Sequence, residues 1–192
     1  MANIFIIHGS YGNPDENWFP WLKKELELLG HKVFVPKFPT PENQSLNSWK
    51  EVFKIYEKFL DKDSIVVSHS LGSAFLLNIL EERDEPIRAA FFVAGFVSDL
   101  GNESFDEINK TFVDRNFDWQ KIRRNCGKFF VFYSDNDPYV PKEVSEELAQ
   151  KLGVEPELIE NAGHFNEKSG YNKFELLLER IREQLAIEDS KV

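Results

Sequence analysis

The sequence predicts an α/β fold in which one parallel sheet is covered by helices on both faces. Short runs of Val, Ile and Phe, such as Ile65–Val67, alternate along the chain with stretches of helical periodicity. The runs are continuously apolar, which is typical of strands that are buried on both faces. Helical crossovers between such strands favour a parallel sheet with helices on either side.

The first strand is expected at Asn3–Ile7 and the second at His31–Pro36. Between them the chain is predicted to be helical over Asn17–Leu29, with Gly30 placed to end the helix. Apolar residues recur there at helical spacing: Trp18, Trp21, Leu22 and Leu29. The second strand is closed by the proline-rich loop 36–41.

An amphipathic helix is predicted over Ser45–Leu60, because its apolar residues fall on one face: Trp49, Val52, Phe53, Tyr56, Phe59 and Leu60. Ile65–Val67 follows as the third strand, and Leu71–Glu82 as the helix after it.

The second half of the chain repeats this alternation. Its strands are expected at Ala89–Ala94, Phe129–Tyr133 and Glu157–Ile159. The helix Lys142–Leu152 is ended by Gly153, and Lys173–Ala186 carries one apolar stripe. Residues 1–192 are therefore expected to form a single domain, with 187–192 as a frayed tail.

The long stretch Phe96–Asn116 is irregular, with polar residues interspersed with phenylalanines. A loop of that length in a compact domain is usually functional, often a lid. A short helix that bridges the fourth and fifth strands is the other interpretation, and such a bridge would also pass over the carboxyl ends of the strands.

Composition excludes several classes of function. The 192 residues carry a formal net charge of −10, so a nucleic-acid backbone would be repelled except at a local basic patch such as 121–124 or 23–24. No apolar run approaches the roughly 20 residues needed to span a bilayer, and no signal peptide is evident. The lone Cys126 excludes an internal disulfide. We therefore expect a cytoplasmic protein that binds neither nucleic acid nor membrane.

Three residue types that perform nucleophilic catalysis follow the third, fifth and sixth predicted strands, in the order Ser70, Asp137, His164. The carboxyl ends of parallel strands form the ligand crevice of such a sheet, so these side chains are expected at one edge. Ser70 would attack, His164 would act as general base and acid, and Asp137 would orient the imidazole.

The segment S-H-S-L-G around Ser70 resembles the G-x-S-x-G nucleophile elbow of α/β hydrolases. Gly72 supplies one small neighbour, whereas Ser68 replaces the first glycine and departs from the pattern. The alternative is that Ser70 is a simple helix N-cap.

Other residues compete for two of the roles. Asp135 and Asp99 also follow strands, but Asp137 lies in D-P-Y-V-P, which resembles the run that carries the triad acid in this superfamily. Asp135 is expected to fix its loop, and Asp99 is held in reserve. The remaining histidines are weaker candidates for the base: His8, His31 and His69.

The oxyanion of an acyl-transfer reaction needs hydrogen-bond donors. The backbone N–H of Leu71 is one expected donor, and that of Ser10, in the loop after the first strand, is the other. The segment H-G-S-Y-G resembles an esterase oxyanion loop. A phosphate loop is the alternative, but neither G-x-G-x-x-G nor G-K-S/T is present.

Taken in order, S-H-S-L-G, F-V-S-D-L, N-C-G, S-D-N-D-P-Y-V-P and N-A-G-H-F resemble the small serine hydrolases grouped with retinoblastoma-binding protein 9 and the bacterial YdeN-like proteins. The resemblance covers residues 3 to about 185. It implies a three-layer α/β-hydrolase-like fold with a six-stranded parallel sheet and a minimal lid. It also implies the triad Ser70, Asp137 and His164. The L-x-C-x-E motif of the vertebrate member is absent around Cys126, so no retinoblastoma interaction is carried over.

The expected function is a serine hydrolase, a carboxylesterase acting on small acyl substrates, with no metal or cofactor and with no identified protein partner. Tyr11 and Trp18, together with aromatic residues of 96–116, are expected to form pocket walls, although core packing competes for most of them. Two alternatives stay open. One is a non-catalytic binding module on the same fold, which the departure at Ser68 favours, and the other is a peptidase or amidase with the same triad.

Overall fold

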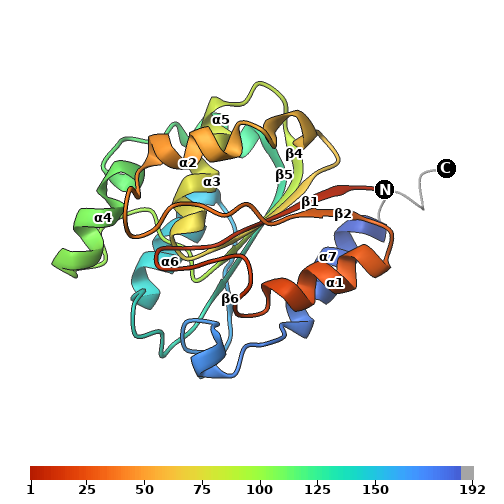
Figure 1. Ribbon diagram of the computed structural model, residues 1–192. Helices are drawn as coiled ribbons and strands as arrows, with labels where there is room; N and C mark the ends of the chain where they lie inside the picture. The colour runs from red at the N-terminus through yellow and green to blue at the C-terminus, as the bar shows by residue number, and fades with distance from the viewer. Residues whose placement is uncertain (187–192) are drawn as a thin grey trace.

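A six-stranded sheet lies between two layers of helices in the computed structural model, which describes residues 1–186 (Figure 1). The strand order is β2-β1-β3-β4-β5-β6, and all neighbouring strands run parallel. The strands are β1 (Asn3–Ile7), β2 (Lys32–Phe34), β3 (Ile65–His69), β4 (Ile87–Val93), β5 (Cys126–Tyr133) and β6 (Glu157–Leu158). The predicted parallel sheet flanked by helices is confirmed. The expected frayed tail, 187–192, lies outside the described residues.

Strands β1 to β5 each have side chains in both hydrophobic cores, which explains why these strands are largely apolar. Ile4 and Ile6 pack beneath α1 (Phe19–Leu28) and α7 (Glu175–Ala186) on one face. Phe5 and Ile7 face the opposite layer, because successive side chains of a strand alternate. That layer contains α2 (Leu46–Phe53), α3 (Leu71–Glu82), α5 (Trp119–Arg124) and α6 (Lys142–Leu152).

The predicted helix Ser45–Leu60 is wrong in its second half. Helix α2 ends at Phe53, and the chain turns through the 3-10 helix η1 (Glu57–Phe59). The turn brings the rings of Tyr56 and Phe59 onto Phe34 of β2, with centroid distances of 5.8 and 4.9 Å. Packing against the edge strand therefore outweighs the helical periodicity of the sequence.

The irregular stretch 96–116 contains a helix, α4 (Glu103–Val113). The Asn102 side chain caps it by accepting hydrogen bonds from the N–H groups of Ser104 and Phe105. Phe112 of α4 is fully buried, so the helix is anchored to the core, and its position beside the site agrees with the bridging interpretation.

The strand order reverses direction between β1 and β3, since the chain leaves β1 toward β2 and returns on its other side to β3. In open α/β sheets, ligands bind outside the carboxyl ends of the strands at such a switch point. The loop after β1 and the turn after β3 are therefore neighbours, and the candidate site lies between them.

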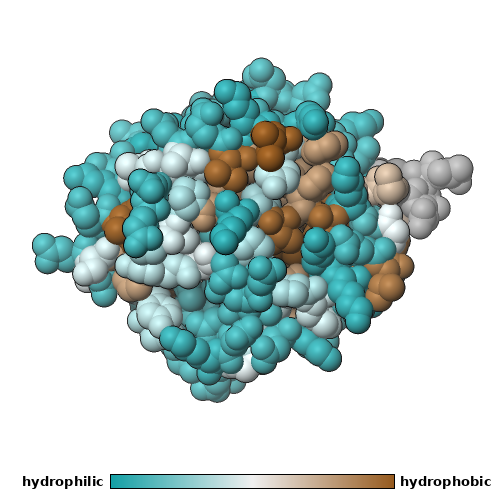
Figure 2. Space-filling view, viewed as in Figure 1, coloured by the Kyte–Doolittle hydropathy of each residue, from teal (hydrophilic) through white to brown (hydrophobic). Residues whose placement is uncertain are grey.

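The face of the molecule seen in Figure 2 is mostly hydrophilic, as the excess of acidic residues leads one to expect. Hydrophobic residues on this face gather mainly near its middle, over the β1–β2 edge of the sheet. Within residues 1–186, no helix combines the length and the apolar character needed to cross a membrane.

Candidate active site

Ser70 occupies a strained turn between β3 and α3. Its backbone has φ 54° and ψ −125°, a region that residues other than glycine seldom adopt. Its N–H donates to the carbonyl of Val93 at 3.0 Å, while its hydroxyl makes no capping hydrogen bond to α3. The simple N-cap interpretation is therefore wrong. Backbone strain of this kind is concentrated at functional sites.

Small residues let α3 start directly against β1. A Cβ atom on Gly72 would lie 2.6 Å from the carbonyl oxygen of Ile7 and 2.8 Å from that of His8. Ser68, which departs from the glycine pattern, is fully buried, and its hydroxyl donates to the Phe91 carbonyl at 3.1 Å. The extra side chain is thus accommodated inside the sheet without an unpaired polar group.

The close approach at Gly72 predicts that Gly72→Ala lowers the free energy of unfolding by about 1–3 kcal/mol, because main-chain atoms of β1 must move. Gly30→Ala serves as the control, since a Cβ atom there meets nothing within 4 Å. The control lowers the free energy of unfolding only because alanine is strained at the φ of 84°, by about 1–2 kcal/mol. Urea unfolding measures both. The two variants should also differ in activity, and a Gly72→Ala enzyme with wild-type kcat would contradict the close packing of the elbow.

His164 is held by Asp137. Nδ1 of His164 lies 2.7 Å from Oδ2 of Asp137, and the two side chains are 10% and 2% exposed. The other carboxylate oxygen accepts from the N–H groups of Tyr139 and Val140 at 2.9 and 3.1 Å. Because Asp137 can only accept when ionised, it fixes the tautomer with the proton on Nδ1 and leaves Nε2 able to take a proton.

The two competing aspartates do not reach His164. Asp135 accepts from the N–H of Asn161 at 2.7 Å and so ties the loops after β5 and β6 together. Asp99 lies in a separate surface hollow beside α4. The loop-fixing role expected for Asp135 therefore agrees with its contact.

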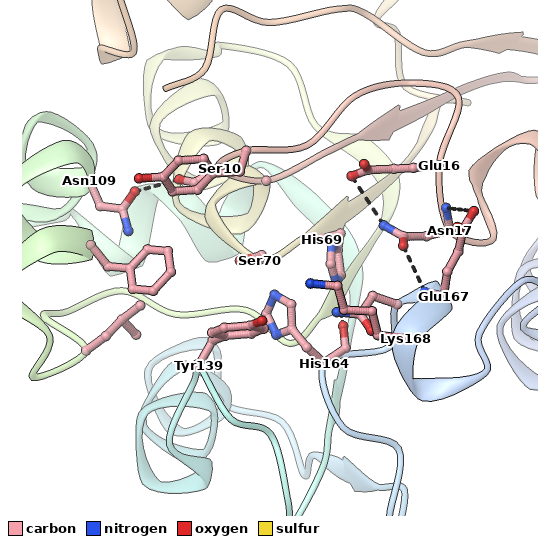
Figure 3. A pocket seen from close by; sticks show the side chains of 15 residues that line it. Ser10, Glu16, Asn17, His69, Ser70, Asn109, Tyr139, His164, Glu167 and Lys168 are labelled. Atoms are coloured by element: carbon pink, nitrogen blue, oxygen red, sulfur yellow. Dashed lines mark hydrogen bonds between the residues drawn. The ribbon is translucent and has the colours of Figure 1, made fainter. Parts of the chain in front are cut away.

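Ser70 and His164 line the same cavity (Figure 3), which has a volume of about 430 Å³. Within residues 1–186 no hydrogen bond joins the Ser70 hydroxyl to the imidazole; such bonds often tighten only when substrate binds. The cavity has an aromatic side and a polar side. It is lined by Gly9, Ser10, Tyr11, Glu16, Asn17, His69, Ser70, Leu100, Phe105, Asn109, Tyr139, His164, Asn166, Glu167 and Lys168.

Of the two residues expected as pocket walls, only Tyr11 lines this cavity. Tyr11 is 56% exposed, and its ring packs edge-on against that of Phe105, with the ring centroids 5.9 Å apart. The expectation that Trp18 forms a pocket wall is wrong. Trp18 is fully buried, and its indole N–H donates to the Phe165 carbonyl at 3.0 Å. Its helical spacing was a core signal, not a site signal.

Several lining residues were missed by the sequence reasoning. Tyr139 lies in the D-P-Y-V-P run and stacks edge-on against the His164 ring at 5.0 Å. A position beside the triad acid was the available signal for it. The polar residues Glu16, Asn17 and Glu167 come from two segments far apart in the sequence, joined by hydrogen bonds, and no local pattern announced them.

His69, inside the elbow, contacts His164 through a hydrogen bond and through its ring. Its Nε2–H donates to the main-chain carbonyl of His164 at 2.8 Å, and the two rings lie 4.7 Å apart. Burial, reinforced by His164, lowers the pKa of His69 to about 3, so the ring is neutral at physiological pH. His8 is also neutral, because burial lowers its pKa: its Nδ1–H donates to Gly9 and its Nε2 accepts from Phe38.

The lowered pKa of His69 predicts loss of stability in mild acid. The unfolded chain, with a histidine pKa of 6.5, binds the proton first, so stability falls as pH drops from about 6.5 toward 3. Between pH 7 and pH 5 the titration of His69 should lower the free energy of unfolding by about 2 kcal/mol. His69→Gln keeps an N–H donor and removes the titration, so urea unfolding should show a shallower pH dependence. Parallel curves for variant and wild type would contradict the assignment.

The main-chain N–H groups of Ser10 and Leu71 make no hydrogen bond within residues 1–186. They are therefore available as donors to a ligand. The loop that carries Ser10 passes close to the elbow, because a Cβ atom on Gly9 would lie 2.7 Å from Cβ of Ser70. These positions agree with those expected of oxyanion donors.

Cys126 does not line the cavity that contains Ser70. Burial raises the pKa of Cys126 to about 12, so its thiol stays protonated, and it lies at the far end of β5. In residues 1–186 no group of three His, Cys, Asp or Glu side chains is arranged to hold a metal ion.

Two known proteins are similar to this chain over most of its length. YdeN of Bacillus subtilis (strain 168) is 30% identical over 177 residues, 91% of each chain. Serine hydrolase RBBP9 of Rattus norvegicus is 28% identical over 163 residues, covering 83% of this chain and 85% of RBBP9.

Solved structures give the same fold. The crystal structure of the B. subtilis ydeN gene product matches with a TM-score of 0.90 and 27% identity, over 97% of this chain and all of that one. Est1E from Butyrivibrio proteoclasticus with bound ferulic acid matches with a TM-score of 0.75 and 16% identity, over 100% of this chain and 90% of Est1E, a likeness of fold alone. A family profile described as serine hydrolase matches residues 4–183. The resemblance in the sequence motifs is confirmed, and the chain belongs to the serine hydrolase family.

Proposed function

We propose that the protein hydrolyses carboxylic esters of small acyl groups by a Ser70–His164–Asp137 triad. The observation that carries the proposal is the 2.7 Å contact between His164 and the buried side chain of Asp137, with the strained Ser70 lining the same cavity as His164. A histidine oriented in this way can take a proton from a serine hydroxyl and hand it on.

In the proposed reaction, Oγ of Ser70 attacks the ester carbonyl while its proton passes to Nε2 of His164. The negative charge that forms on the carbonyl oxygen is stabilised by the N–H groups of Ser10 and Leu71. Collapse of the tetrahedral intermediate breaks the bond to the alcohol, which takes the proton from His164. Water then attacks the acyl-enzyme by the same route, releasing the acid and restoring Ser70.

Two sides of the cavity support a substrate with unlike ends. Phe105 of α4 packs against Tyr11 and offers an apolar surface, while Glu167 and Lys168 make the side of the cavity away from Asn109 of α4 polar (Figure 3). A volume of about 430 Å³ suits a small molecule.

The lone buried cysteine supports a reducing location, and we propose the cytoplasm.

Labelling with a fluorophosphonate tests the catalytic proposal, because the reagent reacts with an activated serine. We expect stoichiometric labelling of the intact protein at Ser70, which peptide mapping would locate. An unlabelled protein would favour a binding module on the hydrolase fold.

A panel of p-nitrophenyl esters of increasing chain length, run beside aminoacyl amides, separates an esterase from an amidase. We expect higher kcat/KM on the esters. The reverse order would assign the triad to a peptidase or amidase.

A further inference from the structure

Three segments that are distant in sequence meet at the aromatic end of the cavity. They are the loop after β1, the segment before α2 and helix α4, and a set of side-chain hydrogen bonds joins them. At their centre is the carboxamide of Gln44, which takes no part in the reaction proposed above.

The amide nitrogen of Gln44 faces three acceptors. Nε2 lies 3.0 Å from each of Oγ of Ser10, Oδ1 of Asn109 and the carbonyl oxygen of Ile108. Ser10 closes the triangle, since its hydroxyl donates to Oδ1 of Asn109 at 2.7 Å. Asn109 is only 2% exposed, so it fixes these contacts to helix α4.

Through Thr40, the amide oxygen of Gln44 is also linked to Tyr11, the residue that follows Ser10 in the loop after β1. Oε1 accepts from the Thr40 hydroxyl at 2.6 Å, and Oγ1 of Thr40 accepts from the N–H of Tyr11 at 2.6 Å. Thr40 therefore accepts from one partner and donates to the other, which fixes the orientation of the Gln44 amide. One side chain thus restrains both Ser10 and Tyr11.

The restrained loop is strained, which is why it needs outside support. Tyr11 has φ 58°, a conformation that costs a residue with a large side chain of order 1–3 kcal/mol. The N–H of Ser10, the residue before it, makes no hydrogen bond within residues 1–186 and depends on the loop for its direction. Donors to an oxyanion act only if they are held within about 0.5 Å of the productive position.

We propose that Gln44 is a positioning residue that holds the Ser10 loop in its oxyanion-binding conformation, with Thr40 and Asn109 as its partners. The inference rests on the proposed function, because it assigns the N–H of Ser10 to the oxyanion. It also gives α4 a second task. Asn109 and Phe105 are four residues apart on one face of the helix, so the helix that lines the cavity also anchors the donor loop.

The first test replaces Gln44 with methionine, which has a similar length and no hydrogen-bond donor. With p-nitrophenyl butyrate we expect kcat to fall about 10- to 100-fold while KM changes less than about 3-fold, because the lost stabilisation exists only in the transition state. The pH dependence of kcat/KM should keep its shape, since Gln44 does not touch His164. Glu42→Ala, an exposed change in the same segment, is the control and should retain wild-type kcat.

A second pair of variants decides the question if Gln44→Met fails to fold. Thr40→Ser keeps the hydroxyl and should retain kcat within about 3-fold, whereas Thr40→Val is nearly the same size and should lose about 10-fold. Wild-type kcat in Gln44→Met, or equal kcat in the two Thr40 variants, would overturn the inference.

Fluorophosphonate labelling separates this result from failure of the proposed function. If the wild type is labelled and Gln44→Met is labelled as fast, the triad stands and the positioning role is wrong. If the wild type is not labelled, the proposed function itself is wrong, and the inference falls with it.

Discussion

Ser70→Ala is expected to lower kcat for p-nitrophenyl esters by about 10⁴- to 10⁶-fold and to abolish fluorophosphonate labelling. Without the hydroxyl no acyl-enzyme can form, and the oxyanion donors and bound water are left with only a small residual rate. The loss should appear in kcat, because the side chain contributes little to binding the ground state.

The fold should survive this change. Alanine meets the same positive φ as serine, and the Ser70 hydroxyl makes no hydrogen bond within residues 1–186 that would be lost. The free energy of unfolding, measured with urea, is therefore expected to stay within about 0.5 kcal/mol of wild type. Ser104→Ala, an exposed serine at the start of α4, is the matched control and should be both labelled and active. Substantial hydrolysis by Ser70→Ala would mean that another residue is the nucleophile.

The sequence predicted the sheet well because the signal for it is local. Continuous apolar runs mark strands buried on both faces, and the residues of β1 alternate between the two cores as that interpretation requires. Periodicity failed where tertiary packing decided the outcome. The helix that begins at Leu46 stops early, because Tyr56 and Phe59 pack better on the edge strand than along a helix.

The candidate site divides in the same way. Ser70, Asp137 and His164 could be identified because each follows a predicted strand, and parallel topology brings strand ends together. Trp18 was misplaced because an aromatic residue at helical spacing reads alike in a core and in a pocket. Gln44 carries no local pattern at all, since its contacts join three segments whose meeting only the fold determines.

Asp137→Asn is the second change with a large expected effect, a loss of about 10⁴-fold in kcat. Oδ1 of Asp137 accepts from two N–H groups, those of Tyr139 and Val140, so an asparagine must keep its oxygen there. Its NH₂ group then faces Nδ1 of His164, a donor where the imidazole needs an acceptor. The ring is forced to carry its proton on Nε2, and it can no longer take one from Ser70.

This argument separates the geometry of the site from its charge. The asparagine side chain fits the same space, so circular dichroism and the urea midpoint should change little compared with the loss in kcat. Asp135→Asn is the matched control two residues away. Within residues 1–186 its carboxylate accepts a hydrogen bond only from the N–H of Asn161, and an amide oxygen can accept the same bond, so kcat should fall less than about 3-fold. Equal losses in the two variants would mean that the loop after β5, not the tautomer of His164, limits the reaction.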